Sequence, residues 1–256
     1  MRVDTLNRPL AVAVVGVGEM GGHHARCLSA LKGVDLVAVV DPDEDRRNSV
    51  AAAYECQPVR TISHLPDVDA AVVATPSASH VDIGCELMER GVHCLIEKPL
   101  ALDRAQAEKL IETADKSHVT LQVGHIERFN PVFNYLQQVA REPRFIESHR
   151  LSPFPARSMD IGVVLDLMIH DLDIVLAFVR SPVEHVDAAG VRVLSASEDI
   201  ANARLRFANG CVANLTVSRV SPESLRKIRV FSGGDEPGYV SLDYREQQGY
   251  HYRLAR

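Results

Sequence analysis

Short apolar runs alternate with charged segments through the first half of the chain. The runs are rich in Val and Ala and have the length of buried strands: Leu10–Val15, Leu36–Val40, Ala70–Ala74, Val92–Ile96 and Val119–Val123. The segments between them have helical spacing and mostly begin with Asp or Ser, which cap helices well: Asp43–Tyr54, Ser79–Arg90 and Asp103–Ser117. This alternation predicts a parallel sheet covered by helices on both faces.

The pattern changes in the second half of the chain. One long apolar segment, Ile161–Val179, has helical spacing and predicts a single helix. The later segments alternate apolar and polar residues and predict strands: Val183–Leu194, Ala201–Phe207, Cys211–Val220, Leu225–Phe231 and Tyr239–Tyr244. We therefore expect an α/β chain of two domains: residues 1–124 with the parallel sheet, and residues 125–256 with an α+β fold and an open, mostly antiparallel sheet.

A glycine-rich turn follows the first predicted strand. Gly16, Gly18 and Gly21 have the spacing G-x-G-x-x-G at the start of the next helix. The first glycine permits a tight turn, the second leaves room for a pyrophosphate, and the third allows the helix to pack closely on the strand. The free N–H groups of the helix favour phosphates. The pattern predicts a Rossmann dinucleotide-binding domain, with Glu19 and Met20 beside the cofactor.

An acidic residue at the end of the second strand indicates which dinucleotide is bound. Asp41 lies 25 residues after Gly16, where a carboxylate accepts the ribose 2′-hydroxyl and repels a 2′-phosphate. NAD is therefore favoured over NADP. Arg46 and Arg47, one or two helical turns later, could accommodate the phosphate and weaken this preference, although a solvated helix face also explains them.

Composition excludes several classes of protein. The chain has 256 residues, of which 46% are hydrophobic and 24% charged, and its formal net charge of −6 argues against a nucleic-acid-binding surface. Its five cysteines have no C-x-x-C spacing, so we expect no disulfide framework, no metal site and a reducing cytoplasm. No segment approaches the roughly 18 apolar residues that span a bilayer, so we expect no membrane contact.

Two segments carry candidate catalytic side chains. Lys98 follows the fourth predicted strand, on the side where ligands bind to parallel sheets, and Pro99 holds it in an extended backbone. In the long helix, Asp166, His170 and Asp173 share one face because of their i, i+4, i+7 spacing. An Asp one turn before a His can orient the imidazole for proton transfer. A surface lysine and structural polar groups are the alternatives.

Four segments resemble the Gfo/Idh/MocA family of sugar and cyclitol dehydrogenases: AVVGVGEMGGHHA, ATPSASH, EKPLA and the D-x-x-x-H pair of the long helix. The resemblance implies that Lys98 and His170 are the catalytic pair and that Asp166 is the third polar member of the site. The cofactor crevice that it implies is lined by Thr75, Pro76, His80, Glu97 and Lys98.

A narrower resemblance concerns the substrate. VGHIERFNP and SPFPARSMDIGVVLDLMIHDLD resemble the branch that oxidises the 3-hydroxyl of UDP-N-acetylglucosamine, on the way to amino sugars and lipid A variants. This implies a UDP-sugar whose diphosphate is held by Arg128, Arg150 or Arg157, although surface charge explains each arginine equally well. The implied substrate-binding residues are Lys98, Arg128, Asn130, Arg157, Asp166 and His170.

Two other functions stay open at this point. A cyclitol or free-sugar dehydrogenase of the same family would gain nothing from a UDP group. A non-catalytic dinucleotide-binding sensor is encouraged by a C-terminal domain that is short for the family. In each case the open sheet exposes one broad face, which another copy would cover, so we expect a homodimer or homotetramer through this sheet.

Overall fold

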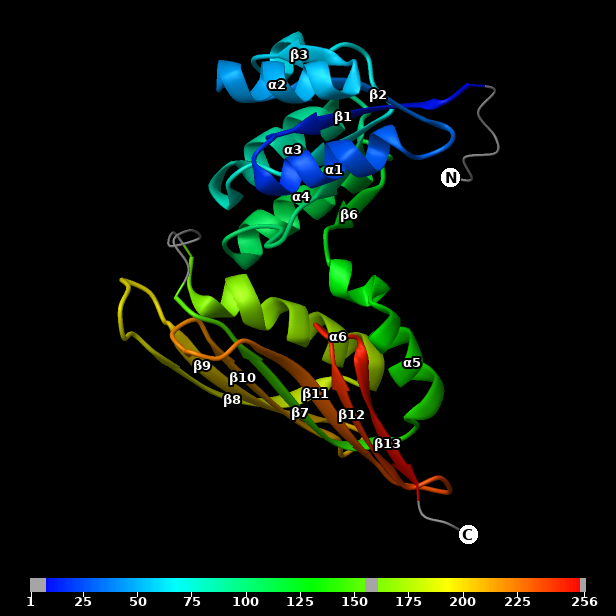
Figure 1. The fold of residues 1–256 in the computed structure, drawn as a ribbon, viewed down its shortest axis with the longest axis vertical. Coiled ribbons are helices and arrows are strands. Elements are labelled where there is room, and N and C mark those ends of the chain that lie inside the picture. The colour runs from blue at the N-terminus through cyan, green and yellow to red at the C-terminus, as the bar shows by residue number, and fades with distance from the viewer. Residues whose placement is uncertain (1–7, 155–160, 254–256) are drawn as a thin grey trace. The chain divides into compact units, whose positions relative to one another are not determined.

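The chain divides into two units, Met1–Gly124 and His125–Arg256 (Figure 1). The computed structural model describes residues 8–154 and 161–253. Each unit has a hydrophobic core of its own, because the apolar clusters of the chain take their residues from one unit or the other.

The first unit is built on a six-stranded sheet in which all neighbours run parallel, in the order β3-β2-β1-β4-β5-β6. Its strands are β1 (Leu10–Val15), β2 (Val34–Val40), β3 (Gln57–Val59), β4 (Ala70–Val73), β5 (His93–Ile96) and β6 (Leu121–Val123). Its helices are α1 (Glu19–Ser29), α2 (Glu44–Tyr54), α3 (His80–Glu89) and α4 (Arg104–Lys116), with short 3₁₀ turns η2 (Ile62–His64) and η3 (Ser77–Ser79). The strand order is that of the Rossmann fold.

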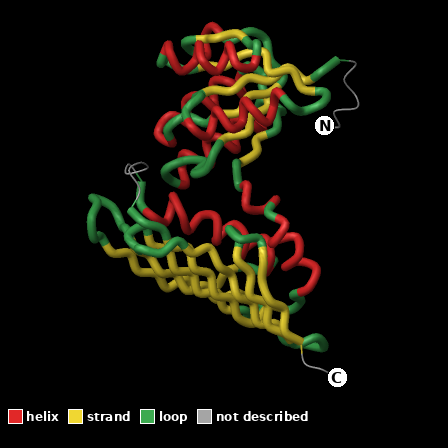
Figure 2. The backbone as a smooth tube through the Cα atoms, viewed as in Figure 1, coloured by secondary structure: helices red, strands yellow, loops and turns green. Residues whose placement is uncertain are grey.

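Both faces of this sheet are buried. Along β1, Val14 belongs to the cluster that contains Ala25 of α1 and Ala51 of α2. Its neighbours Ala13 and Val15 belong to a second cluster, which includes α3 and α4. Because successive side chains of a strand point to opposite faces, the helices cover the sheet on both sides, as the sequence predicts (Figure 2).

The short strand β3 is the element of this sheet that the apolar pattern did not predict. It has three residues, includes Pro58 and lies at the sheet edge, where a missing backbone N–H is tolerated. The predicted run Leu36–Val40 is observed as β2, which begins two residues earlier at Val34.

The second unit contains a seven-stranded sheet in the order β13-β12-β11-β7-β10-β9-β8. Its strands are β7 (Pro143–Leu151), β8 (Val183–Val191), β9 (Ile200–Phe207), β10 (Val212–Ser218), β11 (Leu225–Ser232), β12 (Gly238–Asp243) and β13 (Gln248–Arg253). Its helical segments are η4 (Ile126–Phe129), α5 (Pro131–Val139), the π-helix η5 (Val164–Met168) and α6 (Ile169–Val179).

One face of this sheet packs against the helices. Phe133 of α5 and Ile174 of α6 join strand residues such as Ile146, Leu215 and Val230 in the core of the unit, so α5 and α6 lie over the same face (Figure 2). β7 pairs with β10 in parallel, and the other strand pairs of the sheet are antiparallel. The predicted fold class, a Rossmann domain followed by an α+β domain with a mostly antiparallel sheet, is confirmed.

The prediction of one helix over Ile161–Val179 is wrong in its first part. The segment begins helical structure with the π-helix η5, which holds Asp166, and only then continues as α6, which holds His170. π-helical turns are rare and occur frequently at functional sites, and apolar periodicity does not reveal them. No helix among the described residues is long and apolar enough to cross a membrane.

Candidate functional site

The glycine-rich turn between β1 and α1 leaves space where a ligand could approach. Gly16 has φ of +82°, and a Cβ there would lie 2.8 Å from the carbonyl oxygen of Ala74. A Cβ on Gly21 would overlap the carbonyl of Gly16, so the helix packs directly on the turn. A Cβ on Gly18, in contrast, would meet no described atom within 4 Å. Two glycines are therefore required by the fold, and Gly18 borders open space at the helix N-terminus.

Asp41 ties this turn to the end of β2. Its carboxylate is buried and accepts hydrogen bonds from the backbone N–H of Val17 at 3.0 Å and of Asp43 at 2.9 Å. The guanidinium of Arg46 lies 3.5 Å from one carboxylate oxygen. A carboxylate offers about four lone-pair directions, so two backbone bonds leave capacity for a ribose hydroxyl. That role for Asp41 stays a prediction.

His80 connects two loops at the same sheet edge. It is the first residue of α3 and is 1% exposed. Its Nδ1 lies 2.9 Å from the carbonyl oxygen of Pro99 and its Nε2 lies 2.9 Å from that of Thr75. The ring therefore holds the loop after β4 against the loop after β5. Its predicted influence on a cofactor would act through these loops rather than by contact, because the side chain is buried.

Glu97 and Lys98 follow β5. The Glu97 carboxylate is 2.7 Å from Nε2 of His24 on α1 and accepts a hydrogen bond from the backbone N–H of Lys98 at 3.2 Å. Burial opposes the ionised form, but His24 and Lys98 outweigh it and hold the pKa of Glu97 below its ordinary value. Gly124 packs against this carboxylate, since a Cβ there would lie 2.9 Å from it. Lys98 is half-buried, and its peptide bond to Pro99 is cis.

These predicted residues gather at one edge of the first unit. Gly16, Asp41, Thr75 and Lys98 each follow a parallel strand, and β2, β1, β4 and β5 are consecutive neighbours in the sheet. The carboxyl ends of parallel strands meet at the same edge, which is where ligands bind in open α/β sheets. Glu19 and Met20 begin α1 at this edge, and Met20 is 41% exposed.

In the second unit, Asp166 lies on η5 and His170 and Asp173 lie on α6. We refer to these three residues as the polar stripe and to the segment formed by η5 and α6 as the stripe helix. Asp166 and His170 are both half-buried. Asp173, one turn after His170, receives two hydrogen bonds from Arg128 of η4, at 2.6 and 2.7 Å. The hydrogen bonds from Arg128 to this carboxylate raise the pKa of the guanidinium. Arg128 is half-exposed, but both of its parallel donors are already engaged by the carboxylate of Asp173.

Arg150 has a different role from the predicted one. It is 3% exposed and donates to Asp171 at 2.9 Å and to Glu127 at 3.0 Å. Ser148 also donates to Asp171, at 2.9 Å. Burial disfavours the charged guanidinium, yet the two carboxylates outweigh it and raise the pKa of Arg150. The hypothesis that Arg150 holds a diphosphate is therefore wrong, because its donors face buried carboxylates.

Asn130 and Arg157 are the two remaining predicted substrate-binding residues. Asn130 caps α5, because its Oδ1 accepts from the N–H of Val132 at 3.1 Å, and its Nδ2 donates to Glu127 at 3.2 Å. Its part in substrate binding stays a prediction. Arg157 lies outside the described residues. Within residues 8–154 and 161–253, no group of three or more His, Cys, Asp or Glu side chains is arranged to hold a metal ion.

Sequence reasoning missed two residues that support these sites. His24 is not among the predicted site residues, yet its Nε2 lies 2.7 Å from the carboxylate of Glu97. Glu198 is not among the predicted residues either, yet it accepts a hydrogen bond from the backbone N–H of Val164, where η5 begins. The signal in the sequence was weak in both cases, because each partner is far away along the chain.

The geometry defines a class: a dinucleotide-binding Rossmann domain followed by an α+β domain with an acidic and histidine-bearing helix. Comparison with known families agrees. The model described as "Oxidoreductase family, NAD-binding Rossmann fold" matches residues 10–125, and the Gfo/Idh/MocA C-terminal domain matches residues 140–233. The chain belongs to the Gfo/Idh/MocA family of NAD-binding oxidoreductases, which confirms the resemblance seen in the sequence.

Several relatives are similar over most of the chain. UDP-N-acetylglucosamine 3-dehydrogenase of Acidithiobacillus ferrooxidans is 39% identical over 92% of this chain and 74% of that protein. Inositol 2-dehydrogenase 4 of Saccharopolyspora erythraea is 34% identical over 65% of this chain and 53% of that protein.

Solved structures have the same fold. The Acidithiobacillus ferrooxidans enzyme GnnA superposes with a TM-score of 0.89, at 37% identity, covering 97% of this chain and 84% of that one. GenD2 from gentamicin A biosynthesis, solved in complex with NAD, has a TM-score of 0.84 at 25% identity, covering 97% and 81%.

Proposed function

We propose that this chain is an NAD-dependent dehydrogenase that oxidises the 3-hydroxyl of UDP-N-acetylglucosamine. The observation that carries the proposal is the 39% identity, over 92% of the chain, with an enzyme of that activity. The polar residues described above supply the chemistry that the reaction needs. In this proposal, Lys98, Asp166 and His170 are the catalytic residues.

Each catalytic residue has a distinct task in this proposal. NAD, when bound, would supply the acceptor for the hydride of the alcohol carbon. His170 takes the hydroxyl proton on its imidazole, because histidine is the side chain best suited to proton transfer near neutral pH. Lys98 donates a hydrogen bond to the same oxygen and stabilises the negative charge that develops there. Asp166, in the turn before His170, orients the imidazole.

The residues at the sheet edge fit NAD. Gly18 has open space where phosphates would approach the helix N-terminus, and the Asp41 carboxylate favours a free 2′-hydroxyl. The guanidinium of Arg46 lies 3.5 Å from that carboxylate, so the positive charge of Arg46 is already partly balanced by Asp41 and is less available to a 2′-phosphate. We therefore keep NAD as the cofactor in preference to NADP.

The UDP group needs cationic partners, and we assign this role to Arg128 and Arg157. Arg128 is half-exposed, and its two parallel donors match a phosphate as well as they match Asp173. Binding a diphosphate would exchange one acidic partner for another. Removing Arg128 should therefore raise the KM for the UDP-sugar and leave the KM for NAD unchanged.

The direct test uses a labelled substrate. UDP-N-acetylglucosamine carrying deuterium at carbon 3 should transfer the deuterium to NAD, and mass spectrometry should show that the sugar has lost that deuterium and one proton. UDP-N-acetylglucosamine deuterated at carbon 4 is the matched control and should yield unlabelled NADH. Reduction of NAD with label from carbon 4, or no reduction with either sugar, would contradict the proposal.

Inositol dehydrogenase is the second candidate, because several similar relatives carry that name. Faster NAD reduction with myo-inositol than with the UDP-sugar would favour it. A non-catalytic sensor would bind NAD, measured as a rise in Tm, and reduce it with neither substrate.

We further infer that copies of the chain associate through the seven-stranded sheet. On the face opposite the helices, Phe145, Phe231, Tyr239 and Tyr252 form a row across four neighbouring strands, with ring centroids 4.8 to 5.9 Å apart. Phe231 is 39% and Tyr252 59% exposed, which is unusual for a row of aromatic rings. Light scattering should give a dimer or tetramer, and Phe231→Arg should give a monomer. A stable wild-type monomer would contradict this inference.

A further inference from the structure

The helix that carries Asp166 and His170 is capped by a residue from another part of the chain. Val163, at the N-cap position of η5, has an apolar side chain that cannot accept a hydrogen bond. Glu198, in the loop between β8 and β9, takes this place. Its backbone carbonyl accepts from the N–H of Val163 at 3.0 Å, and its Oε1 accepts from the N–H of Val164 at 3.3 Å.

The segment before the helix makes room for this contact. A Cβ on Gly162 would overlap the carboxylate of Glu198, so a side chain at this position would push the carboxylate away. The carboxylate is also the charge that a helix N-terminus favours. Gly162 and Glu198 therefore form a matched pair, although they lie far apart in the sequence.

A buried ion pair holds the loop that presents Glu198. Asp199 and Arg219 are both 0% exposed, and the Nε of Arg219 donates to Asp199 at 2.8 Å. Asp199 also accepts from three consecutive backbone N–H groups, those of Val193, Leu194 and Ser195, at 2.7 to 2.9 Å. Burial opposes the ionised form, but these bonds outweigh it and hold the pKa of Asp199 well below its usual range.

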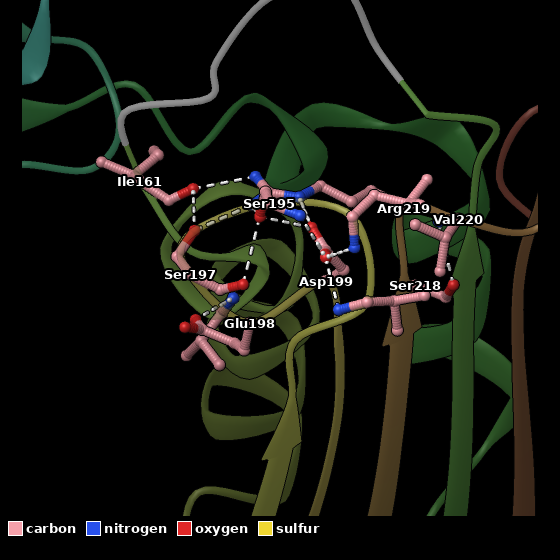
Figure 3. Close-up of polar contacts among 11 residues, drawn as sticks. Ile161, Ser195, Ser197, Glu198, Asp199, Ser218, Arg219 and Val220 are labelled. Atoms are coloured by element: carbon pink, nitrogen blue, oxygen red, sulfur yellow. Dashed lines mark hydrogen bonds and ion pairs between the residues drawn. The ribbon is translucent and has the colours of Figure 1, made fainter.

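Arg219 joins this loop to the residue that leads into the helix. Its Nη1 donates to the carbonyl of Ile161 at 2.8 Å, and its Nη2 donates to Ser195 and Ser197 at 2.8 Å each (Figure 3). One guanidinium thus fixes the position of Ile161 relative to the loop that holds Glu198. We refer to Ser195, Ser197, Asp199 and Arg219 as the Arg219 cluster.

We propose that Glu198, held in place by the Arg219 cluster, is a positioning residue that sets where η5 begins and so where Asp166 and His170 lie. The π-helical turn makes this necessary, because a π turn is less stable than an α turn and its first N–H groups need partners. That Asp166 and His170 are catalytic rests on the function proposed above. The capping contact itself does not depend on that function.

The kinetic test compares substitutions that remove the cap with one that keeps it. Glu198→Ala should lower kcat by about 10-fold to 100-fold, because small displacements of catalytic groups are costly. Glu198→Gln retains an oxygen acceptor and should stay within about threefold of wild type, with the KM for NAD unchanged in both. Gly162→Ala keeps the carboxylate but displaces it, so it should reproduce the loss. Glu184→Ala, an exposed charge on β8, is the control.

A second measurement does not need substrate. The ring signals of His170 in an NMR spectrum, assigned by their loss in His170→Asn, should shift or broaden in Glu198→Ala and Gly162→Ala. They should match wild type in Glu198→Gln and in the control. Unchanged His170 signals in Glu198→Ala would overturn the positioning role, as would equal kinetic losses in Glu198→Ala and Glu198→Gln. An inactive wild type with the expected NMR changes would instead contradict only the proposed function.

Discussion

The two units hold their candidate site residues by different means. In the first unit, Gly16, Asp41 and Lys98 each follow the end of a parallel strand, and backbone geometry brings them to one edge. In the second unit, Asp166 and His170 lie on one helical segment, which is held by charged side chains from elsewhere in the unit. The first arrangement depends on space and turn geometry, and the second depends on the pairing of buried charges.

This contrast indicates which kind of substitution should destabilise each unit. Added carbon atoms damage a tightly packed turn because close-packed atoms cannot move far. Loss of one partner damages a buried ion network because the remaining charge has neither water nor a counter-charge. Substitutions in each unit can test these two sensitivities.

The largest expected effect is on catalysis. Lys98→Ala and His170→Ala should each lower kcat by about 10²- to 10⁴-fold, the usual contribution of a proton acceptor or an oxyanion-stabilising group. The Kd for NAD, measured by fluorescence titration, should change by less than about twofold. Lys116→Ala, at an exposed helix position, is the control and should be fully active. Turnover like wild type in both variants would disprove the catalytic assignment.

The next effect is on the stability of the second unit. Arg150→Met leaves Asp171 and Glu127 buried without their cation and should lower the free energy of unfolding by about 3–5 kcal/mol, measured with urea. Neutralising the carboxylates as well, with Asp171→Asn and Glu127→Gln, should recover part of the loss.

Arg104→Ala, in α4 of the first unit, provides the comparison with an exposed ion pair. Its ion pair with Glu108 is exposed, so the free energy of unfolding should change by less than about 1 kcal/mol. Equal effects of Arg150→Met and Arg104→Ala would show that burial does not distinguish the two ion pairs.

Two glycines of the first unit should separate folding from cofactor binding. Gly21→Ala should lower the free energy of unfolding by about 1–3 kcal/mol, because its Cβ would overlap the Gly16 carbonyl. Gly18→Ala should leave stability unchanged, since its Cβ meets open space, but it should weaken NAD binding measured by calorimetry. Full NAD affinity in Gly18→Ala would place the phosphates elsewhere.

The smallest effect is the pH dependence contributed by Glu97. Its pKa is lower in the folded chain than the ordinary value of about 4.3, so the folded state binds fewer protons there. The resulting stability is fully present above the ordinary pKa and is lost as the pH falls through the folded one. The difference in the free energy of unfolding between wild type and Glu97→Gln should therefore shrink on acidification. A difference that stays constant would contradict the contact between Glu97 and His24.

How far the sequence predicted the site differs between the two units. The sequence predicts the glycine turn, Asp41 and Lys98 because each directly follows an apolar strand segment. Such a segment consists of consecutive residues and is therefore visible in the sequence. In the second unit, the sequence indicates which charged residues are candidates, but it does not predict which residues they pair with. Arg128 and Arg150 look alike in the sequence, yet Arg128 is half-exposed and pairs with Asp173, whereas Arg150 is buried and pairs with Glu127 and Asp171.

The sequence by itself determined most strands and helices of the first unit, the nucleotide-binding turn and the family resemblance, because these depend on residues close together along the chain. It did not predict β3, α5, β7 or β13. Only the tertiary structure decided which partner each charge has, that the stripe helix begins with a π turn, and that Glu198 caps it. The physical reason is that burial and pairing arise between segments far apart in sequence: 21 residues separate Arg150 from Asp171, 34 separate Val164 from Glu198, and 73 separate His24 from Glu97.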